Sequence, residues 1–185
     1  MGKKELRKEA LSRRRALTEE QRREYSDAIC RKIFELPELC GVKTVFSYLA
    51  AWDEADMSLL NAELEKRGLR VAYPVCFDGG IMEAYIPETE DAVESAAFGI
   101  KSPIVSRSVL VTPEEIDLVI VPCVGFDGEK NRLGHGGGYY DRYLARCPQA
   151  KTVCTAFEAQ RLNAVPTDEY DIKPNAVVTE KDLIR

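Results

Sequence analysis

The chain has 185 residues, of which 45% are hydrophobic and 31% charged, and its formal net charge at pH 7 is −5. This length suits one domain, residues 1–185, with enough apolar side chains for a substantial core. The negative charge argues against general nucleic-acid binding, and no apolar run approaches the ~18 residues that a membrane span needs. An anionic ligand would therefore need a local cluster of positive charge.

Cysteine and histidine usage gives little indication of a metal or disulfide framework. The six cysteines include no C-x-x-C pair, and His135 is the single histidine, which makes a zinc site an unsuitable interpretation. Most cysteines lie in apolar segments, as reduced thiols in a cytoplasmic protein would. The basic N-terminus contains no hydrophobic secretory segment, which agrees with a cytoplasmic location.

Two helices are predicted at the N-terminus. The first, residues 3–16, is strongly basic, and Lys3 and Arg7 share one face because they lie four residues apart. A solvated basic helix is the ordinary interpretation of such a run. The second helix, from residue 18 to about residue 35, opens with a capping box of sequence TEEQ.

Strands and helices alternate along the rest of the chain. The predicted helices cover residues 57–67 and 139–147, with a short helical link at 158–162, and the predicted strands cover residues 44–50, 69–75, 81–86, 116–121, 152–157 and 176–179. A turn at residues 78–80 makes the strand after it an antiparallel partner of the strand before it. This order predicts a layered α/β fold with a largely parallel sheet.

The stretch between the strand at 116–121 and the helix at 139–147 carries the clearest functional signal. Arg132 is followed closely by four glycines, which are Gly134, Gly136, Gly137 and Gly138. Glycines let backbone N–H groups approach a phosphate, and the start of a helix adds partial positive charge. The stretch therefore predicts an anion cradle.

Two side chains extend this prediction. Arg132 can make a bidentate contact with phosphate, and Asp141, one turn into the helix, could hold a divalent cation against phosphate oxygens. A flexible surface loop is the alternative interpretation of the glycines. The loop matches neither the G-x-G-x-x-G fingerprint nor the P-loop motif.

The sequences GFD at residues 125–127 and RLGHGGGYYDR at residues 132–142 closely resemble the signature of the 5-formyltetrahydrofolate cyclo-ligase family. The resemblance extends over nearly the whole chain. It implies a three-layer α/β sandwich in which ATP and a folate meet in one cleft. The implied reaction converts 5-formyltetrahydrofolate and ATP to 5,10-methenyltetrahydrofolate, ADP and phosphate, with Mg²⁺ as cofactor. No obligate protein partner is evident from the sequence.

The same resemblance implies roles for individual residues. The ATP-binding residues would be Lys3, Lys4, Arg7, Arg132, Leu133, Gly134, His135, Gly136, Gly137, Gly138, Tyr139 and Tyr140. The folate-binding residues would be Leu49, Glu54, His135, Gly136, Gly137, Gly138 and Tyr139. Arg132 and Tyr139 are the candidate catalytic residues, and Asp141 and Asp171 the candidate magnesium ligands. His135 is expected at the rim, contributing contact area and positive potential.

The chain also departs from the family pattern. Within the segment 98–103, Ser102 stands where the family has a glutamate. Tyr170 stands where the family often has a histidine, and Cys76, after the strand at 69–75, stands where a lysine is often found. Two other classes of function stay open. A phosphate cradle would also serve a phosphotransferase or ATPase with another acceptor, or a non-catalytic folate- or nucleotide-binding relative.

Overall fold

The computed structural model describes residues 2–95 and 100–185, so part of the predicted family match at residues 98–103 lies outside the described residues. Within the described part, no helix combines the length and apolar character required to span a membrane.

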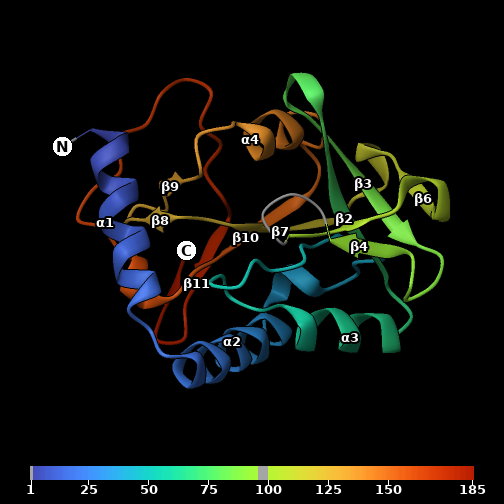
Figure 1. The fold of residues 1–185 in the computed structure, drawn as a ribbon, viewed down its shortest axis with the longest axis horizontal. Helices are drawn as coiled ribbons and strands as arrows, with labels where there is room; N and C mark the ends of the chain where they lie inside the picture. The colour runs from blue at the N-terminus through green and yellow to red at the C-terminus, as the bar shows by residue number, and fades with distance from the viewer. Residues whose placement is uncertain (1, 96–99) are drawn as a thin grey trace.

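A central sheet lies between the helices of the described chain (Figure 1). It has eight strands, in the order β12-β11-β10-β7-β1-β2-β3-β6. Its strands are β1 (Thr44–Phe46), β2 (Arg70–Phe77), β3 (Ile81–Pro87), β6 (Ser108–Val111), β7 (Leu118–Pro122), β10 (Lys151–Thr155), β11 (Ala176–Val178) and β12 (Leu183–Ile184). The five neighbours from β11 to β2 pair in parallel, whereas β12, β3 and β6 join antiparallel. The predicted largely parallel sheet is therefore confirmed.

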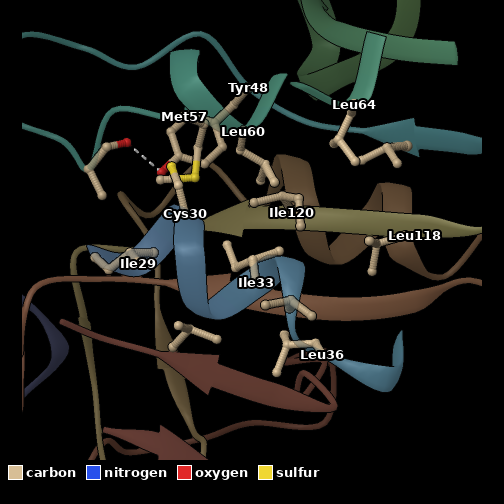
Figure 2. Packing of buried hydrophobic residues seen from close by; sticks show 14 of the residues in the cluster. Ile29, Cys30, Ile33, Leu36, Tyr48, Met57, Leu60, Leu64, Leu118 and Ile120 are labelled. Carbon is tan, nitrogen blue, oxygen red and sulfur yellow. Dashed lines mark hydrogen bonds between the residues drawn. The ribbon is translucent and has the colours of Figure 1, made fainter. Parts of the chain in front are cut away.

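Helices cover both faces of this sheet. Helices α2 (Glu19–Phe34) and α3 (Ser58–Lys66) lie on one face, and the short α4 (Tyr139–Leu144) lies on the other (Figure 1). Successive strand residues point to opposite faces, so Leu118 and Ile120 pack against α2 and α3, as Figure 2 shows, while Val119 packs in the core cluster below α4. The three-layer prediction is confirmed.

Helix α1 (Lys3–Arg15) lies outside these layers, beside the sheet (Figure 1). Its buried Leu6 and Ala10 form a separate apolar cluster with Val124, Leu133 and Leu162. This packing directs a second face of α1, which carries Lys3 and Arg7, toward loops at one edge of the sheet.

Two predictions that depend only on residues close together in the chain agree with the structure. The Thr18 hydroxyl accepts a hydrogen bond from the Gln21 amide, and the Gln21 side chain accepts one from the Thr18 amide, so the capping box at the start of α2 is confirmed. The predicted hairpin is also confirmed, because β2 and β3 pair antiparallel around Gly79 and Gly80, both with φ near +75° (74° and 76°).

Other elements differ from their predicted bounds. The strand predicted at 44–50 ends at Phe46, because the chain after it forms a loop. The helix predicted at 139–147 ends at Leu144 and is followed by turns that lead to Pro148. Two small antiparallel strand pairs were not predicted, β4 (Val93–Ser95) with β5 (Lys101–Pro103) and β8 (Gly125–Phe126) with β9 (Arg132–Leu133). Their strands are too short for a periodic pattern to develop.

Candidate active site

The candidate site lies at the carboxyl edge of the parallel strands. Strands β1 and β7 are neighbours, and the chain leads from β1 to β2 on one side and from β7 to β10 on the other. Open α/β sheets bind ligands in the crevice at such a reversal of strand order. Three loops meet this edge: the segment after β1 that contains Glu54, the glycine-rich loop before α4, and the segment between β10 and β11 that contains Asp171.

The glycine-rich loop offers unused backbone donors. The amide N–H groups of residues 134–138 donate no hydrogen bond to any residue in the described part of the chain. Gly136 has φ +103° and Gly138 has φ +67°, values that favour glycine. The carbonyl of Gly134 accepts from Arg7, and that of Gly137 accepts from Arg142, so two arginines hold the loop through its carbonyls.

The structure corrects one part of the predicted cradle. The hairpin β8–β9 lies between strand β7 and the glycine loop, so the loop does not follow the strand directly. Helix α4 has only six residues, and its macrodipole is correspondingly small. The capacity to bind an anion therefore depends on the loop amides and on neighbouring cations rather than on the helix terminus.

Arg132 at the end of this hairpin is a nearly buried cation. It is 8% exposed, and its Nη2 donates to Asp141 Oδ1 at 2.5 Å. Its Nε is buried and has no hydrogen-bond partner among the described residues. Burial acts to lower the pKa of Arg132, but the neighbouring groups, Asp141 foremost, together raise it. The guanidinium therefore stays charged and keeps donors available for a ligand.

The two predicted metal ligands are close neighbours in the fold. Asp141 Oδ1 accepts from the amide of Ile172, the residue next to Asp171. Lys3 Nζ donates to Asp171 at 2.7 Å and to Asp168 at 2.8 Å, and these hydrogen bonds raise the pKa of Lys3. A hollow of about 180 Å³ lies here, lined in part by Arg132 and Asp171.

These carboxylates meet the needs of Mg²⁺ only together with a ligand. Asp141 Oδ2 and Asp171 Oδ1 accept no hydrogen bond from the described residues, so each carboxylate keeps one free oxygen. Mg²⁺ typically binds through one or two carboxylates plus substrate phosphates and water. The described residues contain no cluster of three or more His, Cys, Asp or Glu side chains suited to a metal, so the pair fits a metal that arrives with phosphate.

Glu54 joins the glycine loop to the segment after β1. Its Oε2 accepts from the Ala51 amide at 3.0 Å, and its Oε1 lies 3.6 Å from His135 Nε2. Burial acts to raise the pKa of Glu54, but His135, the Ala51 amide and Arg14 together lower it. Glu54 is therefore ionised at neutral pH. The His135 side chain is 63% exposed, as expected for a residue at the rim.

The remaining predicted site residues differ in burial and in their contacts. Leu49 is half-buried against the core beneath α2 and α3, and Leu133 is almost completely buried in the cluster beside α1. Lys4 is exposed and makes no ion pair with a described residue. The Arg142 guanidinium lies over the ring of Tyr139, 5.5 Å from the ring centroid, and Tyr140 stacks on Phe46.

Arg14 and Asp168 also belong to this region and were not predicted, and Asp53 lies beside Arg14. Asp53 precedes Glu54, and Arg14 lies seven residues after Arg7 on the same helix face, which is the signal that the sequence contained. Of the departures from the family pattern, Ser102 Oγ donates to the Pro74 carbonyl at 3.4 Å. Tyr170 is 76% exposed.

Together, the fold and the site define an α/β protein with a candidate anion-binding crevice at the switch point of a mainly parallel sheet. Comparison with known proteins narrows this class. The family model described as 5-formyltetrahydrofolate cyclo-ligase family matches residues 1–180. The chain belongs to the 5-formyltetrahydrofolate cyclo-ligase family, and the prediction of an enzyme of the ligase class is confirmed.

Individual relatives agree with this assignment. The chain is 34% identical over 173 residues to a protein from Escherichia coli K12 named 5-formyltetrahydrofolate cyclo-ligase, covering 90% of this chain and 94% of the relative. The mouse protein of the same name is 29% identical over 97% of this chain and 94% of its own length. The solved structure of Aquifex aeolicus 5,10-methenyltetrahydrofolate synthetase superposes with a TM-score of 0.86 at 36% identity, over 100% of this chain and 93% of that one.

Proposed function

We propose that this protein cyclises 5-formyltetrahydrofolate to 5,10-methenyltetrahydrofolate with ATP and Mg²⁺, releasing ADP and phosphate, and that residues 1–185 act as one catalytic domain in the cytoplasm. One observation carries the proposal: the buried Arg132, with an unpartnered Nε, lies beside a run of loop amides that donate to no described residue. Such a set of positive donors suits the phosphates of a nucleotide.

The chemistry requires activation of the formyl oxygen, which is a poor leaving group. Transfer of the γ-phosphoryl group of ATP to that oxygen gives an iminium phosphate and ADP. The lone pair of N10 then forms the new C–N bond, the C–O bond breaks with its electron pair leaving on phosphate, and the N10 proton is released. Phosphoryl transfer depends mainly on positioning and charge neutralisation, so no protein nucleophile is required.

Different residues of the crevice would bind the phosphates and the folate. The loop amides and Arg132 would neutralise the transferred phosphoryl group, and Lys3 and Arg7 would hold the other phosphates. Glu54 and the loop backbone would orient the folate, with Tyr139 between the two substrates and Leu49 providing apolar contact.

Magnesium would be held by the free oxygens of Asp141 and Asp171. When bound, it would supply charge neutralisation to the phosphate oxygens. Lys3 and Arg132 occupy the other carboxylate oxygens, so both cations stay next to the phosphates that they would help to neutralise.

The experiment that tests this function is a spectrophotometric assay of methenyl formation from 5-formyltetrahydrofolate, with ATP and Mg²⁺ each omitted in turn. We expect product only when all three are present. ATP turnover without the folate would instead indicate an ATPase, and binding of both ligands without product would indicate a non-catalytic relative.

Replacement of Lys3 by Met should raise the KM for ATP on the order of tenfold, or about 1.4 kcal/mol, because a charged partner of the phosphates is lost. Lys8→Met is the matched control, since Lys8 is exposed on the same helix and forms no ion pair with a described residue. Steady-state kinetics at saturating folate give both values. Equal KM values for the two variants would show that Lys3 is only a partner of Asp168 and Asp171.

Replacement of His135 by Arg should retain most of kcat. The exposed imidazole lies 3.6 Å from Glu54 Oε1, and an arginine can make the same contact with the carboxylate but cannot act as a base near neutral pH. The measurement is kcat against pH for both proteins. A wild-type titration near pH ~6.5 that disappears in an inactive variant would instead identify His135 as a general base.

A further inference from the structure

One face of helix α1 touches all three loops of the candidate site. Lys3, Arg7 and Arg14 lie at spacings of four and seven residues, which places them on one side of the helix. Lys3 pairs with Asp171, and Arg7 donates to Gly134 in the glycine loop at 2.7 Å. Arg14 reaches the third loop, the segment after β1.

Arg14 makes a buried ion pair in that loop. The side chain is 2% exposed, and its Nη2 donates to Asp53 Oδ1 at 2.7 Å. Asp53 is itself 3% exposed, and Arg15 reaches its second oxygen at 3.4 Å. Arg14 Nη1 lies 3.8 Å from Glu54 Oε1, so one guanidinium faces two consecutive carboxylates.

Stability alone is a poor reason for this arrangement. Desolvation of two charges offsets much of the attraction in a buried ion pair, and apolar residues of similar size often stabilise a fold as well. The Nε and Nη1 atoms of Arg14 are buried without a hydrogen-bond partner among the described residues, which adds a further cost. The geometry does, however, fix the segment that presents Glu54.

We propose that Arg14 is a positioning residue for the folate substrate. Through Asp53 it holds the segment after β1, and with its second amino group it keeps the ionised Glu54 carboxylate directed toward His135 and the glycine loop. This inference rests on the proposed function, in which Glu54 contacts 5-formyltetrahydrofolate. Because Arg14 lies away from Lys3 and Asp171, its effect is confined to the folate half of the site.

The test measures the two ligands separately by titration calorimetry, with 5-formyltetrahydrofolate in the absence of ATP and Mg-ATP in the absence of folate. Arg14→Met should weaken folate binding on the order of tenfold while the Kd for Mg-ATP changes less than twofold. Arg14→Lys, which keeps the charge, should recover part of the folate affinity. Arg13→Met is the matched control, since Arg13 bonds to Glu9 and to the Arg161 carbonyl outside the site.

A double variant, Arg14→Met with Asp53→Leu, separates positioning from folding. It leaves no unpaired buried charge, so its melting temperature should return toward that of the wild type while its folate affinity stays low. The assignment would be overturned if the double variant recovered folate affinity together with its melting temperature. It would also be overturned if Arg14→Met bound both ligands equally weakly, or if it bound folate as tightly as the wild type. A wild-type protein that binds no 5-formyltetrahydrofolate would refute the proposed function itself, and the assignment with it.

Discussion

Replacement of Gly136 by Val is expected to lower kcat for methenyl formation by roughly 10²–10³-fold, the scale of losing preorganised backbone donors. Gly136 has φ +103°, a conformation that a β-branched residue rarely adopts. A Cβ atom there would lie 3.4 Å from the guanidinium carbon of Arg7, which holds the loop through the Gly134 carbonyl. The loop would therefore change shape, and its amides would move from the positions that they have in the structure.

Gly128→Val is the matched control for this loop substitution. Gly128 lies in the turn between β8 and β9, its φ is not in the left-handed region, and a Cβ atom there would meet nothing within 4 Å. We expect wild-type kcat and melting temperature for Gly128→Val, and a folded protein with low kcat for Gly136→Val. Retention of full activity by Gly136→Val would show that the loop amides are not part of the phosphate site.

Replacement of Asp141 by Asn should lower kcat on the order of 10²-fold, or about 2.7 kcal/mol. The change removes one proposed magnesium ligand and also the carboxylate that pairs with the buried Arg132 at 2.5 Å. A neutral amide accepts a weaker hydrogen bond from the guanidinium and binds Mg²⁺ poorly. The apparent Mg²⁺ requirement should therefore rise together with the fall in kcat.

Asp91→Asn provides the control for the loss of an aspartate–arginine pair alone. Asp91 pairs with Arg107 at 2.7 Å on the exposed surface, so its loss should change neither kcat nor the Mg²⁺ titration. Treatment of the wild type with EDTA should abolish product formation, and added Mg²⁺ should restore it. Undiminished activity after exhaustive chelation, or an unaltered Mg²⁺ titration in Asp141→Asn, would remove the metal role from this site.

Much of the fold could be predicted from the sequence because its signals are local. The capping box at Thr18, the glycines between β2 and β3, and the apolar run at 116–121 each depend on residues close in the chain, and each prediction agrees with the structure. Very short strands were not predicted, because they have no local signal. Strands β9 and β12 have two residues each, and only their pairing with other strands defines them.

The candidate site was predictable in part. The signature from Arg132 to Arg142 is contiguous, so its glycines, tyrosines and aspartate could be named from the sequence alone. The hairpin that delivers Arg132 could not be predicted, because its strands have only two residues each and because one of its contacts, the hydrogen bond from the Val165 amide to the Asp127 side chain, joins residues far apart in the chain.

By itself, the sequence determined the layered α/β class and the family to which the chain belongs, and it located the glycine-rich loop that we propose binds phosphate. Only the tertiary structure decided which charges meet. Lys3 and Asp171 are 168 residues apart yet form an ion pair, and Arg14 and Asp53 are 39 apart and buried together. No local pattern encodes such contacts, because they arise where the packing of α1 against the sheet edge brings its cationic face to three separate loops.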